Sequence, residues 1–64
     1  MYFLTEGKTK VEGKWHTTYG IGFGEEEIPD ITTDKESLQN FVDLINFHKL
    51  DPVHIYDAVY DFIG

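Results

Sequence analysis

The chain has 64 residues and a mass of 7.4 kDa, with 41% apolar and 27% charged residues. A chain of this length folds as one domain and leaves roughly 40% of its unfolded surface exposed to water, which excludes a large enclosed active site. Five lysines stand against 12 carboxylates, so the net charge is −7 at pH 7. This charge opposes direct binding to nucleic acid or to an anionic membrane, and it favours encounter with a basic protein surface.

The sequence contains no cysteine, which excludes disulfides, thiolate zinc sites and cysteine nucleophiles. Its longest apolar run, residues 1–4, is much shorter than the core of a signal peptide or a membrane-spanning helix. We therefore expect a cytoplasmic protein, in the cytoplasm of the host cell if a phage encodes it, with no membrane association.

The first part of the chain predicts a β-hairpin. Aromatic and β-branched residues are frequent in residues 2–4 and 15–23, and Glu12-Gly13 between them suits a tight two-residue turn. That turn would place four pairs on one face, which we expect to be the core face: Tyr2–Phe23, Leu4–Ile21, Glu6–Tyr19 and Lys10–Trp15. On the other face Phe3 would cover Gly22. We expect a cation–π contact between Lys10 and Trp15, with Trp15 as an interface anchor as the alternative.

Residues 24–31 predict a polar connection followed by a short edge strand. Gly24 and the run Glu25, Glu26 and Glu27 form the connection. Residues 28–31 are extended but contain Pro29, which cannot donate to a strand ladder, so we expect at most an edge strand there.

Two helices are predicted in the remainder of the chain. Thr33 and Glu36 match a capping box, which indicates a helix starting at Asp34, with an inward face formed by Leu38, Phe41, Val42 and Ile45. Asp51-Pro52 gives a second start signal, an N-cap followed by proline at the first helical position. The second helix should run to about Ile63, and the side chains that we expect inward are Ile55, Tyr56, Val59, Phe62 and Ile63.

These elements define an α+β fold in ββ(β)αα order within a single domain, residues 1–64. An antiparallel β-hairpin, with at most a third short edge strand, is packed on one face by two helices. Three segments have a pattern found in known proteins: Thr18–Gly22, Ile31–Glu36 and Leu50–Asp57 running into Asp61–Ile63. In these segments the chain resembles a family of short proteins from Gram-positive bacteria and their mobile elements, known only as a domain of unknown function. The resemblance implies the same fold and no particular activity.

Carboxylates and aromatic residues in residues 25–64 supply the candidate partner-binding site. Residues 1–24 contain three lysines and two glutamates, whereas residues 25–64 contain two lysines and ten carboxylates, a net charge of −8. Asp57 and Asp61 stand one helical turn apart with His54 in the same stripe, and a solvated helix face is the alternative interpretation. Phe47 or Tyr60 would be an aromatic anchor if exposed, although the second helix could instead cover Phe47. The candidate residues are Glu25, Glu26, Glu27, Asp43, Phe47, Asp57, Tyr60 and Asp61.

The sequence offers little for catalysis or metal binding. Ser37, the only serine, has no histidine at a spacing typical of a catalytic dyad. The glycines Gly20, Gly22 and Gly24 lie in and just after a strand, whereas phosphate binding requires glycines at the start of a helix. His48, Asp51 and His54 are competent zinc ligands by type, but capping roles account for Asp51 and His48. We therefore expect no enzyme, no cofactor and no metal.

These observations lead to two functional expectations. The first is a non-catalytic acidic binding module, an inhibitor or regulator that occupies the basic surface of a partner, such as a nucleic-acid-binding protein. Small phage and mobile-element products of the anti-CRISPR kind provide the analogy of size and charge. The alternative is a self-associating structural or regulatory module, a homodimer formed through the Thr- and Gly-rich face or through an exposed strand edge.

Overall fold

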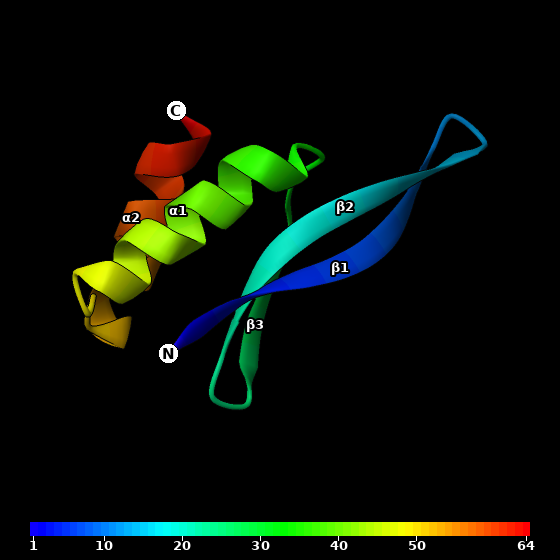
Figure 1. Ribbon diagram of the computed structural model, residues 1–64. Coiled ribbons are helices and arrows are strands. Elements are labelled where there is room, and N and C mark those ends of the chain that lie inside the picture. Colours follow the sequence, from blue (N-terminus) through cyan, green and yellow to red (C-terminus); the bar gives the residue numbers. More distant parts are fainter.

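The computed structural model describes all of residues 1–64 and has the predicted α+β architecture (Figure 1). Its strands β1 (Tyr2–Val11), β2 (Lys14–Phe23) and β3 (Glu26–Thr32) form one antiparallel sheet in the order β1-β2-β3. The helical elements that follow are α1 (Lys35–Phe47), a short 3₁₀ segment (Pro52–His54) and α2 (Ile55–Ile63). Both helices lie on the same side of the sheet, so the predicted ββ(β)αα arrangement is confirmed with its third strand present.

The first hairpin has the predicted register. Tyr2 pairs with Phe23, Lys10 with Trp15, and the ladder continues without a break to the turn. Glu12 and Gly13 both have positive φ, at 51° and 79°, as a two-residue turn matching the right-handed twist of the strands requires. The prediction that Phe3 covers Gly22 is also confirmed, because a Cβ atom added to Gly22 would collide with the Phe3 ring.

The third strand is longer than predicted, and its first two residues correct the sequence interpretation. Glu26 and Glu27 belong to β3 and pair with Phe23 and Gly22, so only Gly24 and Glu25 form the connection. The tight turn is possible because Gly24 takes a φ of 60°. Because the turn is so short, the ladder resumes at once, and the glutamate run becomes the start of a strand.

A bulge in the middle of β3 accommodates Pro29. The pairs with β2 are regular from Phe23 to Ile21 and then shift before Tyr19 pairs with Thr32. Pro29 lies within the irregular stretch, where its missing N–H removes no ladder hydrogen bond. The next residue, Asp30, has a φ of 55°, and its carboxylate accepts a hydrogen bond from the buried hydroxyl of Thr18.

The core lies between the helices and one half of the sheet. Its buried apolar side chains come from β1, β2, α1 and α2: Tyr2, Ile21, Phe23, Leu38, Val42, Ile45, Ile55 and Val59. The rings of Phe41 and Phe62 join the two helices at a centroid distance of 4.8 Å. Glu6 and Lys10 share the predicted core face but are exposed, because the helices do not extend over that part of the hairpin.

The starts of both helices differ in detail from the sequence prediction. The N-cap of α1 is Asp34, not Thr33, because the Asp34 Oδ1 accepts the backbone N–H of Ser37 at 3.1 Å. The helix therefore begins at Lys35. Asp51 caps the second helical segment as predicted, but the chain first makes a 3₁₀ turn, and α2 begins only at Ile55. Between the helices Lys49 has a φ of 52°, and it ends the first helix.

Side-chain hydrogen bonds attach the start of β1 to the helical side. The Asn46 side chain accepts the backbone N–H of Tyr2 through Oδ1 and donates to its C=O through Nδ2, both at 2.8 Å. The Tyr2 hydroxyl donates to the C=O of Leu50 at 2.8 Å. The turn between the helices is thereby fixed to the first residue of the sheet.

Residues 7–17 form an arm that extends beyond the helices (Figure 1). β3 pairs only with the Tyr19–Phe23 part of β2, so the arm is a two-stranded ribbon with no third neighbour. None of its residues is buried. The molecule measures 39 × 24 × 17 Å along its principal axes, and this elongation follows the hairpin. The other residues are called the body below.

Candidate functional site

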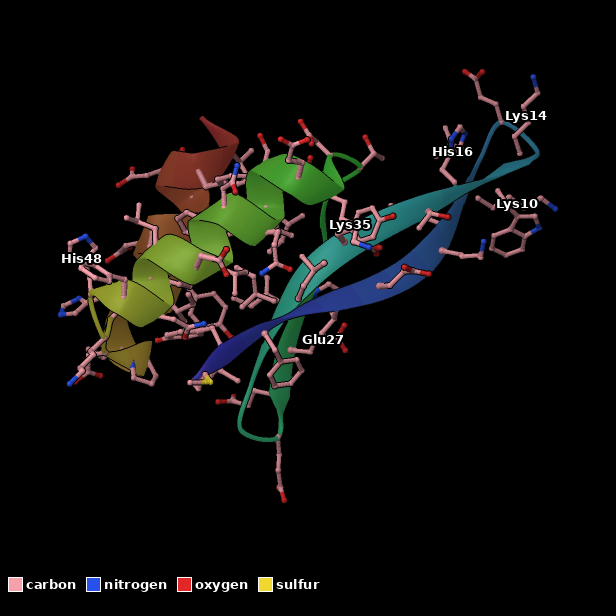
Figure 2. All side chains as sticks on the ribbon, viewed as in Figure 1. Lys10, Lys14, His16, Glu27, Lys35 and His48 are labelled. Atoms are coloured by element: carbon pink, nitrogen blue, oxygen red, sulfur yellow. The ribbon has the colours of Figure 1, made fainter.

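The arm and the body differ in charge. Lys8, Lys10 and Lys14 lie on the arm together with His16, and Figure 2 shows Lys10, Lys14 and His16 gathered toward its outer end. The body keeps only Lys35 and Lys49, against eleven carboxylates, which are Glu6 and the ten in residues 25–64. Most of the positive charge is therefore held at a distance from most of the negative charge.

The eight predicted site residues are all exposed, but they do not form one patch. Glu25 lies in the β2–β3 turn and Glu26 and Glu27 at the start of β3, at an end of the sheet that projects away from the helices (Figure 1). Asp43 and Phe47 lie on α1, whereas Asp57, Tyr60 and Asp61 lie on α2. The structure thus brings the last three together on one helix and keeps the glutamate run apart.

An apolar stripe on α2 is the main feature that the sequence prediction missed. Tyr56 and Ile63 were expected to be inward, but they are 62% and 65% exposed. With Val53 at 74% and Tyr60 at 76% exposure, they follow a three-four-three spacing along one side of the helical segment. This spacing is a helix-interface pattern. The spacing is present in the sequence, directly beside the inward-facing Ile55, Val59 and Phe62.

Two carboxylates flank this stripe. Asp57 and Asp61 are exposed and one turn apart, next to Tyr60 around the helix. At the C-terminal end of the stripe an open groove of about 250 Å³ is lined by Phe62 and Ile63 from α2 and by residues from the end of β3 to the first turn of α1. We use the name α2 surface for the four apolar and two acidic side chains: Val53, Tyr56, Asp57, Tyr60, Asp61 and Ile63.

Phe47 is a separate exposed aromatic residue. Its side chain is 80% exposed at the end of α1, so the alternative that the second helix covers it is wrong. The ring meets the His48 ring edge to face at a centroid distance of 5.2 Å. His48 is the C-cap residue of α1, in agreement with the structural role expected for it.

The arm carries the expected cation–π contact. The Lys10 Nζ lies 5.9 Å from the centroid of the Trp15 ring, on directly paired residues of β1 and β2. Trp15 is nevertheless 66% exposed. The contact therefore organises the surface of the arm without contributing to the core.

Several carboxylates accept hydrogen bonds from uncharged donors, which are backbone N–H groups and a side-chain amide. Asp34 and Asp51 accept backbone N–H groups at the starts of helical segments, and Asp43 accepts from the side-chain amide of Gln39 at 3.0 Å. No three histidine, aspartate or glutamate side chains converge where they could hold a metal ion. Ser37 lies in the first turn of α1, where its backbone N–H serves the Asp34 cap.

Tyr2 is the titratable group with a clear shift. Burial of its side chain raises the pKa of the phenol above its usual value of 10.0, and the nearby Asp51 carboxylate raises it further. Tyr2 lies under the turn between the helices, bonded to Leu50, so this shift reflects packing of the body.

Comparison with protein-family models, with curated proteins and with solved structures finds no match. None of the helices combines the length and the apolar character needed to cross a membrane.

Proposed function

We propose that the protein is a non-catalytic acidic binding module that uses its α2 surface to occupy a basic surface on a partner protein. The observation that carries the proposal is the apolar stripe of Val53, Tyr56, Tyr60 and Ile63, exposed beside Asp57 and Asp61. An inhibitor or regulator of a nucleic-acid-binding protein is the class of function that suits this combination.

The apolar stripe supports binding in preference to a solvated helix face. Single exposed apolar residues are common on protein surfaces. Four such residues aligned along the 3₁₀ turn and α2 form an exposed patch, and such patches are typical of interaction sites. Two of the four are tyrosines, which are enriched among the residues that dominate binding energy. The geometry is that of an amphipathic helix whose apolar side enters a groove on its partner.

The acidic flank indicates the charge of that partner. Asp57 and Asp61 lie in the part of the chain with a net charge of −8, and three of the five lysines are on the distant arm. Such a field accelerates association with a cationic surface and suppresses wrong partners of like charge. Surfaces that bind nucleic acid are strongly basic, which is why proteins of that class are the proposed targets. The same charge opposes pairing of the α2 surface with itself.

Affinity purification from the native host tests the proposal when the native chain is compared with two variants of equal net charge. Asp57→Lys/Asp61→Lys changes the α2 surface, and Glu25→Lys/Glu26→Lys makes the same charge change at the β2–β3 turn. The captured protein is identified and expressed, and its binding is then measured with purified components at low and high salt. We expect binding that weakens with salt, loss of binding in the first variant and retention in the second.

A third variant separates charge from apolar contact. Tyr56→Ala/Tyr60→Ala leaves the net charge unchanged and removes two exposed rings, so it should weaken binding by increasing the dissociation rate. Equal losses in both charge variants would mean that only the overall field matters, and retention of binding in Asp57→Lys/Asp61→Lys would remove the α2 surface from the proposal.

A further inference from the structure

One edge of β1 presents unpaired backbone groups. The Asn46 side chain bonds to both the N–H and the C=O of Tyr2, which shows that these two groups point away from β2. In an antiparallel strand the groups of alternate residues point to the same side. The N–H and C=O groups of Leu4, Glu6, Lys8 and Lys10 therefore lie along the same outer edge as those of Tyr2.

Nothing in the fold protects this edge beyond Tyr2. β1 is the first strand in the sheet order, so no other strand covers its outer side. Its ladder with β2 is regular from Tyr2 to Val11, without a bulge or proline that would prevent further pairing. A regular, uncovered edge is a template for one more strand.

We propose that this edge pairs in antiparallel fashion with the same edge of a second copy, with the two-fold axis at Gly7. In this register Glu6 of each copy stands opposite Lys8 of the other, and Leu4 stands opposite Lys10. The outward-pointing groups of these residues then face one another and form the hydrogen bonds of the new ladder. The result is a dimer with a continuous six-stranded sheet. This dimer goes beyond the proposed function and uses a different part of the molecule.

Charge complementarity selects this register. Opposite charges on directly facing residues stabilise a strand pair, and like charges destabilise it. Moving the axis by one residue toward Lys8 pairs Glu6 with Lys10 of the other copy but places Lys8 opposite itself, a like-charge pair that the register about Gly7 does not have. Moving the axis toward Glu6 places the glutamate opposite itself. It also pairs Tyr2 with Lys10 of the other copy, although the Tyr2 backbone groups are already bonded to Asn46. Gly7 at the axis adds no side chain where the two backbones come closest.

The same arrangement brings the lysine arm of each copy beside the acidic body of the other. Antiparallel pairing about Gly7 places the outer end of one arm next to the start of β1 in the second copy. Lys8 and Lys10 are an even number of residues from Tyr2, a core residue, so their side chains lie on the same face of the sheet, the one that α1 packs against. Asn46 shows which flank of α1 reaches the β1 edge, and Asp43 is on that flank one turn away. The arm lysines therefore approach an exposed carboxylate of the other copy.

The α2 surface stays accessible in such a dimer. α2 packs near β3, at the opposite edge of the sheet from β1. The two proposals can therefore fail separately, because Asp57→Lys/Asp61→Lys should leave the dimer intact.

Charge-swapped variants test the register. In Glu6→Lys the new lysine faces Lys8 of the second copy, and in Lys8→Glu the new glutamate faces Glu6. Each variant alone should be monomeric by light scattering after size exclusion, whereas the native chain should show twice the 7.4 kDa of one chain. An equimolar mixture of the two variants restores both opposite-charge pairs and should form a heterodimer. The double variant Glu6→Lys/Lys8→Glu should form a homodimer again.

Two controls complete the test. Glu36→Lys and Lys35→Glu make the same charge changes on α1 and should remain dimeric. Hydrogen exchange followed by NMR should show slow exchange of the Glu6 and Lys8 amides in the native chain and fast exchange in Glu6→Lys. A native chain that remains monomeric at high concentration, or a variant mixture that does not associate, would overturn the proposal. So would a monomer that pairs at this edge only with a strand of another protein.

Discussion

The same two strands run through the arm and the body, yet they are stabilised in different ways. In the body β2 lies between β1 and β3, and Ile21 and Phe23 are buried beneath the helices. In the arm the strands have only each other, a two-residue turn and a surface cation–π contact. An isolated two-stranded ribbon is at best marginally stable in water. The arm therefore depends on the body to hold its base, and the reverse dependence is weak.

This difference also separates the two proposed interactions. The body contributes the acidic, apolar α2 surface on a helix fixed by Ile55 and Val59, which suits a preorganised binding site. The arm contributes lysines and unpaired backbone groups, which suit strand pairing with a second copy. The fold thus places opposite charges on two elements that do not neutralise each other within one chain.

The largest expected contrast comes from removing an apolar side chain in each region. Leu38→Ala deletes a fully buried side chain in the centre of the core and should lower the free energy of unfolding by about 2–5 kcal/mol. Val11→Ala, at the outer end of the arm, removes a half-exposed side chain and should change it by roughly 0.5 kcal/mol or less. Urea unfolding followed by circular dichroism measures both. Equal losses of unfolding free energy in the two variants would show that side-chain packing stabilises the arm as strongly as it stabilises the body.

A second comparison uses two glycines of β2 that lie two residues apart. A Cβ at Gly20 would collide with backbone atoms of Ile28 and Pro29 at the bulge of β3, whereas a Cβ at Gly22 would meet the side chain of Phe3. The Phe3 ring is half exposed and can move aside, but the β3 backbone cannot without loss of pairing. Gly20→Ala should therefore cost about 3 kcal/mol and Gly22→Ala about 1 kcal/mol.

The measurement is again the free energy of unfolding, together with the NMR signals of β3. Gly20→Ala should shift signals of the bulge, and Gly22→Ala should shift those of Phe3 alone. The reverse order of stabilities would mean that the sheet face opposite the helices adapts more easily at the bulge than at Phe3.

The sequence predicted the hairpin register well, because one turn fixes every pair. Once Glu12-Gly13 is identified as the two-residue turn, every pair of the hairpin is determined, including the contact between Phe3 and Gly22. The extent of burial was less predictable. Glu6, Lys8 and Lys10 on the core face indicated in retrospect where the helices end, but alternation alone does not show how far a helix pair reaches along a strand.

Errors in the helical part have a common physical cause. Tyr56 and Ile63 were expected to be inward because they are apolar and adjacent to the buried stripe. A helix that rests on one layer buries only a narrow face, however, and Ile55, Val59 and Phe62 already fill it. The exposure of the predicted carboxylates followed from their chemistry, whereas the apolar half of the α2 surface required the packing to be known.

The smallest expected effect concerns Tyr2, the body residue that fixes the base of β1 to the turn between the helices. Burial, and secondarily the Asp51 carboxylate, raise the pKa of the Tyr2 phenol in the folded protein above the value of 10.0 expected for the unfolded chain. As the pH rises past 10, the unfolded state loses this proton first. The contribution of Tyr2 to stability is therefore complete below pH 10 and is lost as the pH passes through the raised pKa of the folded state.

Tyr2→Phe removes the hydrogen bond to Leu50 and should lower the free energy of unfolding near neutral pH by about 1 kcal/mol. Its stability should then fall less steeply above pH 10 than that of the native chain, while Tyr60→Phe, which alters an exposed ring on the α2 surface, serves as the matched control. If the difference in free energy of unfolding between the native chain and Tyr2→Phe grew above pH 10, the raised pKa of Tyr2 in the folded protein would be contradicted.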